Sequence, residues 1–154
     1  MIPNQPRMNW VIQNAHLTNA LRIGVLCREL GYSNTDEEML ECLESLLISQ
    51  SDYIGVAVDE TGGIGGWIQA HASQILESGF RVEIVGMIVD APCRRLGIGR
   101  KLVQAAESWA IQKGASRVVV RSNITRSESH AFYAALGYTE NKTQRVYRKL
   151  LPTS

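Results

Sequence analysis

The stretch CRRLGIGRKL, residues 93–102, places two glycines and four basic side chains within ten residues. The apolar run VEIVGMIV shortly precedes it, and a pattern typical of an amphipathic helix follows it. Glycines let a ligand approach the backbone closely, and the unpaired amides and dipole of a first helical turn attract anions. The basic residues are Arg94, Arg95, Arg100 and Lys101. The stretch therefore indicates either a site for a phosphate-bearing ligand or a basic turn whose charges are simply solvated.

Two common phosphate-binding loops do not fit this stretch. A P-loop needs a lysine and then a hydroxyl residue after its last glycine, whereas Arg100 follows Gly99. A dinucleotide fingerprint needs a third glycine at the position that Leu102 occupies. What remains is the pattern R-x-x-G-x-G, formed by Arg94, Gly97 and Gly99, which leads directly into a helix.

Length and composition limit the classes of protein to which the chain can belong. The chain has 154 residues, the length of one ordinary domain, and its 16 Lys and Arg nearly balance its 15 Asp and Glu. That balance favours neither nucleic acid nor an anionic membrane as a partner. Cys27, Cys42 and Cys93 lack the spacing of a metal site, and the N-terminus lacks the apolar region of a signal peptide. We expect a single domain over residues 1–154 that binds no metal and works in the cytoplasm.

The hydrophobic pattern predicts a mixed α/β sheet. Strand patterns cover residues 9–13, 53–58, 64–72, 80–89, 117–122 and 144–150. Helix patterns cover residues 18–30, a segment that begins within 33–38, and residues 97–113 and 128–137. In the first helix, Leu21, Val25 and Leu26 fall on one face and are expected to pack inward. The strands at 80–89 and 117–122, with the helix between them, form a crossover whose first turn is the basic stretch.

Two segments resemble the GNAT superfamily of N-acetyltransferases. IVDAPCRRLGIGRKLVQAAESWA, residues 88–110, is similar to the acetyl-CoA motif [QR]-x-x-G-x-[GA] of that family, and SESHAFYAALGY, residues 127–138, is similar to its later Phe-Tyr helix. The resemblance implies an α/β (α+β) fold whose mostly antiparallel sheet has about seven strands and about four helices. It further implies a splay between the fourth and fifth strands. The implied activity is transfer of an acetyl group from the cosubstrate acetyl-CoA to a primary amine, by direct attack in a ternary complex.

The resemblance assigns one end of the fourth strand to the pantetheine arm of acetyl-CoA. The backbone of Met87, Ile88 and Val89 is expected to pair with that arm as if it were an added strand. This requires the fourth and fifth strands to separate, and Gly86 is a candidate for the bulge that starts the separation. Close packing against a neighbour explains a glycine there equally well.

The remaining cofactor contacts are assigned in the same way. Asn123 is expected to bind pantetheine by hydrogen bonding, although asparagine is also a common turn former. Many family members have asparagine and alanine where this chain has Arg126 and Ser129, and we expect one of these two to replace the usual contact. The backbone amides that would hold the pyrophosphate follow Arg94 and belong to Arg95, Leu96, Gly97, Ile98, Gly99 and Arg100.

Glu83 is the candidate general base. An alkylamine is mostly protonated at neutral pH, so it must lose a proton before it attacks the thioester. Glu83 lies eleven residues before Arg94, which is the spacing of the base in the histone-acetylating branch of the family. It also lies on an apolar strand, where desolvation would strengthen it as a base. A solvent-facing or arginine-paired Glu83 is the structural alternative.

Tyr133 matches the family's general acid, which would protonate the departing thiolate. A phenol with a pKa of about 10 is suited to that transfer. The alternative is a core tyrosine beside Phe132 on an amphipathic helix. A backbone amide near Gly86 or Met87 is a candidate oxyanion donor.

The identity of the acceptor is less constrained. It is expected to be a small-molecule or peptide amine, selected by the first helices and by residues 73–79. His71 shares a strand face with Trp67 and Gln69, so it is either a lining residue of the acceptor pocket or a hydrogen-bonded structural histidine. The family also implies a homodimer as one possible assembly. A non-catalytic acyl-CoA-binding module is the alternative function.

Overall fold

The computed structural model describes residues 9–121 and 127–153, and the chain divides into two units, Met1–Arg121 and Ser122–Ser154. The strands of the first unit are β1 (Val11–Asn14), β2 (Asp52–Val58), β3 (Ile64–Ile75), β4 (Gly79–Val89) and β5 (Val118–Val120). Its helices are α1 (Ala20–Glu29), α2 (Asp36–Ile48) and α3 (Ile98–Gln112), with short 3-10 turns η1 (Leu17–Asn19) and η2 (Ala91–Cys93). The described part of the second unit contains α4 (Ser127–Ala135).

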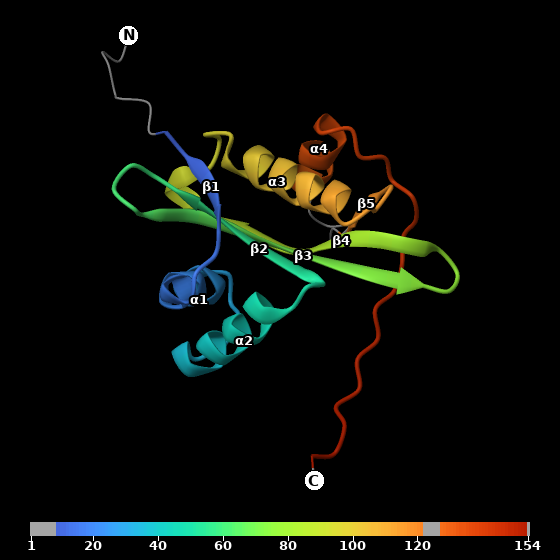
Figure 1. Ribbon diagram of the computed structural model, residues 1–154, viewed down its shortest axis with the longest axis horizontal. Helices are drawn as coiled ribbons and strands as arrows, with labels where there is room; N and C mark the ends of the chain where they lie inside the picture. The colour runs from blue at the N-terminus through green and yellow to red at the C-terminus, as the bar shows by residue number, and fades with distance from the viewer. Residues whose placement is uncertain (1–8, 122–126, 154) are drawn as a thin grey trace. The chain divides into compact units, whose positions relative to one another are not determined.

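The strands of the first unit form one mixed sheet in the order β1-β2-β3-β4-β5. All neighbours are antiparallel except β4 and β5, which are parallel and are joined through α3 as the sequence predicted. Figure 1 shows α1 and α2 on one face of the sheet and α3 on the other. The predicted α/β class is confirmed.

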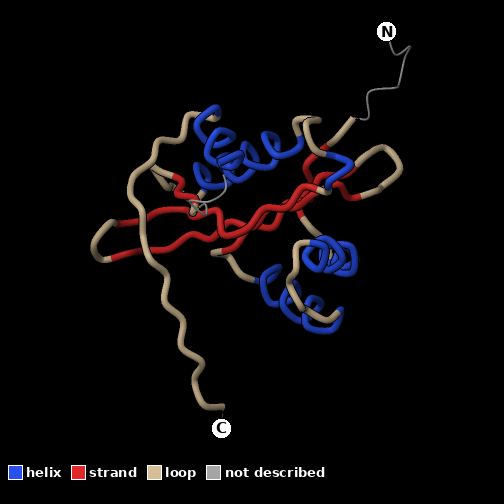
Figure 2. The backbone as a smooth tube through the Cα atoms, turned by 180° about the vertical axis from the view of Figure 1, so that it is seen from behind, coloured by secondary structure: helices blue, strands red, loops and turns tan. Residues whose placement is uncertain are grey.

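The predicted number of about seven strands is wrong for the part of the chain that the structure describes, because the sheet has five. The segment 144–150, expected to be the closing strand, has no regular structure and is drawn as loop in Figure 2. A strand needs a neighbour for its backbone hydrogen bonds, and no described strand pairs with this segment. Its large apolar side chains are exposed, Val146 by 87% and Leu150 by 82%.

The β3–β4 hairpin is longer than the sequence indicated. β3 continues through Ile75 and β4 begins at Gly79, so the segment 73–79 is mostly strand and only its tip is a turn. Gly79 has a φ of +82°, the left-handed conformation that glycine adopts most easily. The turn therefore forms at the far end of a two-stranded extension.

The buried face of α1 also differs from the predicted one. Leu26 is fully buried as expected, but Leu21 is 60% exposed and Val25 is 38% exposed. Ile23 and Cys27 take the inward positions instead. The buried stripe of α1 is therefore rotated from the predicted one and combines Ile23 and Leu26 with the small residues Ala20 and Gly24.

The packing of α3 fixes the basic stretch against the sheet. The helix buries the face formed by Ile98, Leu102, Val103, Ala106 and Ala110. Gly66 of β3 makes the close approach possible, since a Cβ there would lie 2.7 Å from the carbonyl oxygen of Ile88 and 3.4 Å from Cγ2 of Ile98. The start of α3 is therefore held firmly beside the end of β4.

β4 and β5 separate just beyond the middle of β4. Their pairing covers only Val82 to Ile84, opposite Val118 to Val120. The ladder to β3 shifts register at the same point, because Gln69 pairs with Gly86 whereas Ala70 pairs with Ile84. The extra residue is therefore Val85, one position before the predicted bulge.

Gly86 also makes the close contact that was its alternative explanation. A Cβ on Gly86 would lie 3.0 Å from the Trp67 ring. The bulge at Val85 and the packing of Trp67 on Gly86 thus occur side by side, and the close packing is the explanation that holds for the glycine itself.

Candidate active site

Beyond Ile84, β4 no longer pairs with β5, so backbone groups in its second half face an open edge of the sheet. The amide of Asp90 donates to the carbonyl of Gly65 at 2.8 Å, which marks these residues as a hydrogen-bonded pair of the antiparallel ladder. Because such pairs alternate along a strand, Ile88 also points its amide and carbonyl toward β3, while Met87 and Val89 point theirs the other way. Of the three predicted pantetheine residues, Met87 and Val89 are thus the ones that offer backbone hydrogen bonds.

The basic stretch leads from this strand edge into α3 through two left-handed residues. Gly97 has a φ of +81° and is the N-cap of α3. Arg95 has a φ of +65°, which is uncommon for a residue with a side chain and is often found where function requires strain. The first intrahelical bond runs from the amide of Lys101 to the carbonyl of Gly97, at 3.2 Å.

Amide hydrogens at the start of α3 are the anion-binding groups of this loop. In any α-helix the amides before the first intrahelical bond have no partner within the helix. Here they belong to Ile98, Gly99 and Arg100, and they carry the positive end of the helix dipole. The side chain of Ile98 is buried, so only its backbone can contact a ligand.

The basic side chains around the loop are not equivalent. Arg94 donates from Nε to the carbonyl of Val89 at 3.4 Å, so its guanidinium lies along the open edge of β4. Lys101 donates from Nζ to the carbonyl of Trp10 at 2.9 Å and ties α3 to the start of the described chain. Arg95 and Arg100 are exposed. Positive charge thus surrounds the helix start, although Lys101 has a structural contact.

A row of polar side chains crosses the sheet where β4 and β5 begin to separate. Asp52 of β2 is directly opposite His71 of β3, and His71 is directly opposite Glu83 of β4. Side chains that are opposite one another project from the same face of a sheet, here the face that carries α1 and α2. The sequence had singled out His71 and Glu83 but not Asp52.

Glu83 makes the arginine contact that was the alternative to catalysis. Its Oε1 lies 3.4 Å from Nη1 of Arg121, just after β5. The Glu83 side chain is 16% exposed, whereas that of Arg121 is 60% exposed. Glu83 is therefore a mostly buried carboxylate with an exposed cationic neighbour, next to the point where β4 and β5 separate.

The second unit contains the candidate acid. Burial raises the pKa of the Tyr133 phenol, so the phenol stays protonated across the neutral range. The ring packs edge-on against Phe132 and Tyr138, with centroids 5.1 Å and 5.7 Å away. Ser129 is half-buried one turn earlier on α4. The predicted contacts at Asn123 and Arg126 lie outside the described residues.

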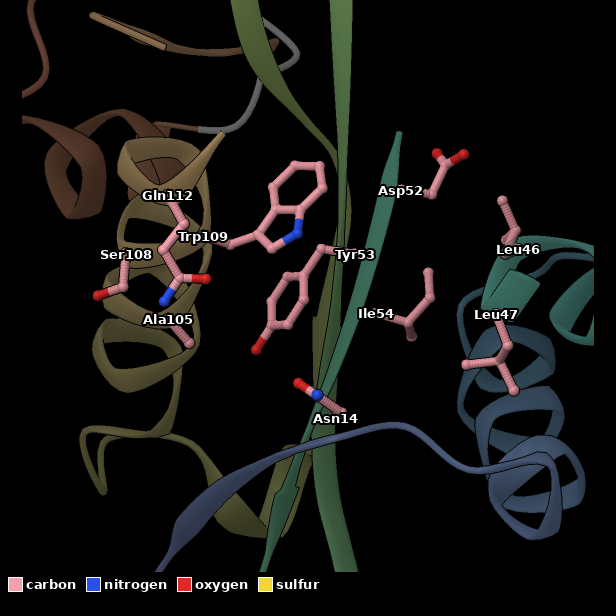
Figure 3. Close-up of a pocket in the computed structure, with 10 residues that line it drawn as sticks. All are labelled: Asn14, Leu46, Leu47, Asp52, Tyr53, Ile54, Ala105, Ser108, Trp109 and Gln112. Carbon is pink, nitrogen blue, oxygen red and sulfur yellow. The ribbon is translucent and has the colours of Figure 1, made fainter. Parts of the chain in front are cut away.

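A pocket of about 380 Å³ lies at the β1–β2 edge of the sheet (Figure 3). Tyr53 stacks on Trp109 of α3 in this pocket, with ring centroids 5.8 Å apart, and burial raises the pKa of Tyr53. None of the predicted cofactor residues lines it. Asp52, beside Leu46 of α2, is the one member of the polar row that does.

Comparison with known proteins defines the class. The acetyltransferase (GNAT) family matches residues 25–138. The uncharacterized N-acetyltransferase YhdJ of Bacillus subtilis (strain 168) is 30% identical over 104 residues, which are 67% of this chain and 72% of that protein. Aminoglycoside N(6')-acetyltransferase type 1 of Klebsiella aerogenes is 38% identical over 66 residues, 43% of each chain.

A solved structure has the same fold. It is aminoglycoside N-acetyltransferase AAC(6')-Iy in complex with CoA, with a TM-score of 0.84 at 21% identity over 97% of this chain and 99% of that one.

The chain therefore belongs to the acetyltransferase (GNAT) family, as the two sequence motifs predicted. It is an N-acetyltransferase that uses acetyl-CoA as cosubstrate and transfers the acetyl group to an amine. No helix in the described part of the chain is long and apolar enough to span a membrane. Among those same residues, no three His, Cys, Asp or Glu side chains gather as metal ligands.

Proposed function

We propose that acetyl transfer proceeds by direct attack of a primary amine on acetyl-CoA while both are bound, within a single domain that spans residues 1–154. The open edge of β4 beside the start of α3 is the observation that carries this proposal. The family match supports the single domain, because residues 25–138 include parts of both units.

The hydrogen-bonding groups and charges of acetyl-CoA match those at the β4 edge and the start of α3. Met87 and Val89 offer a strand edge without a strand partner among the described residues to the amide groups of pantetheine, which can add to it as a further strand would once the Arg94 side chain leaves the Val89 carbonyl. The pyrophosphate would then reach the amides of Ile98, Gly99 and Arg100, where the helix dipole favours negative charge. Acetyl-CoA supplies the activated acyl group when bound, and these backbone groups orient it.

Two side chains have assigned proton-transfer roles. Glu83 takes a proton from the acceptor amine. Its position where the pairing of β4 with β5 ends supports that role. Tyr133 gives a proton to the departing thiolate, and its burial supports that role because it keeps the phenol protonated. The direct-attack mechanism needs both transfers.

The acceptor class is proposed from the relatives. The Klebsiella protein is an aminoglycoside N(6')-acetyltransferase, so aminoglycosides are the first amines to test for this chain. The exposed apolar residues of α1 and the polar row lie on the same side of the sheet and could contact such an acceptor.

One experiment tests the proposed function as a whole. Purified protein is mixed with acetyl-CoA and each member of a panel of aminoglycosides, polyamines, amino acids and peptides, and release of free thiol is followed. We expect at least one amine to increase thiol release well above the rate without acceptor. Calorimetric binding of acetyl-CoA without any amine-dependent thiol release would instead indicate an acyl-CoA-binding module. Absence of acetyl-CoA binding would contradict both.

We also propose a homodimer. The segment that follows α4 exposes large apolar side chains, which soluble monomers seldom leave together at the surface. They are Val146, Tyr147, Leu150 and Leu151, between 76% and 87% exposed. Light scattering is expected to give twice the chain mass, and the double change Val146→Ser and Leu150→Ser to give a monomer. A wild-type monomer at micromolar concentration would contradict this assembly.

The cytoplasm remains the proposed location. Cys27, Cys42 and Cys93 are all free thiols, which is usual in a reducing compartment. Fractionation of cells that express the protein would measure its location directly.

A further inference from the structure

The proposed function leaves one proton without an assigned destination. An acceptor enters as an ammonium ion, R–NH3+, and leaves as the amide R–NH–CO–CH3, so its nitrogen loses two protons. One of these protons is balanced by the proton that the sulfur of CoA gains when the thiol forms. The other must reach solvent, and a carboxylate that is 16% exposed needs a neighbour that can pass it on.

His71 is placed to be that neighbour. It is directly opposite Glu83 in the β3–β4 ladder, and Cβ atoms of directly opposite residues are about 4.5–5.5 Å apart. The His71 side chain is 43% exposed, much more than that of Glu83. A proton that moves from Glu83 to His71 therefore moves toward water.

Asp52 fixes the protonation pattern of the His71 ring. Its Oδ1 lies 2.9 Å from Nδ1 of His71, and its Oδ2 accepts a hydrogen bond from Oγ of Ser49 at 2.7 Å. A carboxylate only accepts hydrogen bonds, so the shared proton is on Nδ1. In the neutral ring the lone pair is then on Nε2, which is the nitrogen that can receive a further proton.

Acidic residues occupy the positions opposite His71 on both neighbouring strands. In the strand register His71 stands between Asp52 on β2, which its ring contacts, and Glu83 on β4, whose carboxylate contacts Arg121. The Asp52 side chain is 11% exposed and has a contact on each oxygen, so it holds the His71 ring in one orientation. A carboxylate that fixes the tautomer and orientation of a histidine ring is a common arrangement at sites where the histidine accepts a proton.

We propose that His71 receives at Nε2, by way of an intervening water, the proton that the acceptor amine gives to Glu83, and releases it to solvent, with Asp52 as the positioning residue. The proposal rests on the proposed function.

Each proton transfer breaks one bond and forms another. The ammonium N–H bond breaks and an O–H bond forms on Glu83; that O–H bond breaks and an N–H bond forms on Nε2. The free amine forms a C–N bond to the thioester carbon, the C–S bond breaks, and Tyr133 protonates the departing sulfur. The second nitrogen proton leaves through solvent and replaces the one that Tyr133 gave up, and His71 returns to its neutral form by protonating water.

The first test needs no acceptor amine. Nitrogen-15 NMR of the free protein at neutral to mildly alkaline pH distinguishes a ring nitrogen that carries hydrogen from one that carries a lone pair. We expect His71 to have its hydrogen on Nδ1, and Asp52→Asn to weaken that preference. Hydrogen on Nε2 in the wild-type protein would overturn the proposal, whatever the protein acetylates.

The second test measures the relay in turnover. His71→Asn keeps a side-chain N–H that can donate to Asp52 but has no lone pair in place of Nε2. With the best amine of the panel, we expect kcat to fall about 10²-fold, the size typical of a lost acid–base group, with acetyl-CoA affinity by calorimetry unchanged. Added imidazole should restore part of kcat in His71→Gly. His16→Asn, at an exposed histidine outside the row, is the matched control and should match wild type.

The outcomes separate the two claims. No amine-dependent thiol release from wild type would be a failure of the proposed function, and the NMR result would then decide the protonation of His71 by itself. A kcat of His71→Asn within twofold of wild type would overturn the relay. Loss of kcat without imidazole rescue, accompanied by a raised KM for the amine, would also overturn it, because it would assign His71 to acceptor binding.

Discussion

Tyr133→Phe is expected to reduce kcat for acetyl transfer by about 10²-fold or more, while the Kd for acetyl-CoA stays within twofold of wild type. The change removes only the hydroxyl, and the ring contacts with Phe132 and Tyr138 remain. Burial raises the pKa of this phenol, so wild-type Tyr133 is protonated at neutral pH, as the proposed role of general acid requires. Steady-state thiol release together with calorimetry measures both quantities.

Tyr147→Phe is the matched control for this change. Tyr147 is 85% exposed and has no assigned role in proton transfer, so removal of its hydroxyl should leave kcat unchanged. If Tyr133→Phe kept full kcat with an acceptor that wild type uses, Tyr133 would be a core tyrosine and another group would protonate the thiolate.

The second large effect is expected at the start of α3. Gly97→Val should weaken acetyl-CoA binding by more than tenfold, since Gly97 has a φ of +81° that a β-branched residue adopts only with strain. A Cβ at this position would meet no atom within 4 Å, so the cost is conformational and not a clash. The loop is then expected to relax away from φ > 0 and to carry the amides of Ile98 and Gly99 out of position.

The same strain can be introduced where no ligand binds. Gly62, in the turn between β2 and β3, has a φ of +85° and is equally open around its Cβ position. Gly62→Val should therefore lower the midpoint of thermal unfolding about as much as Gly97→Val, while acetyl-CoA affinity in calorimetry stays at the wild-type value. Equal losses of affinity in both variants would mean that Gly97 acts through stability alone.

Local signals explain why much of the site could be predicted. The glycines, the bases and the apolar run of residues 82–103 each act over a few neighbouring residues, and the structure places them at a strand end, a left-handed turn and a helix start, as expected. The N-cap of α2 is similar, because Thr35 accepts from the amide of Glu38 at 3.1 Å within one turn. Such features need no knowledge of distant contacts.

Features that depend on pairing between distant segments were missed. Asp52 has no motif of its own, and its role follows only from being opposite His71. The strand patterns 53–58 and 64–72 are separated by a short turn from which pairs could be counted, but the register shift between Ala57 and Val58 moves every pair beyond it by one residue. The buried face of α1 and the number of strands failed for the same reason, since both are decided by what lies across from them.

The early end of the β4–β5 pairing has a consequence for the protein when its cosubstrate is scarce. Among the described residues, the second half of β4 then has no strand partner on one side, and an open strand edge of this kind promotes association with other chains. A cosubstrate that covers Met87 and Val89 would complete the sheet as well as bring the acyl group, and tight binding to the native form alone adds to the free energy of unfolding. The metabolic supply of acetyl-CoA would in this way govern the solubility and lifetime of the enzyme as well as its rate.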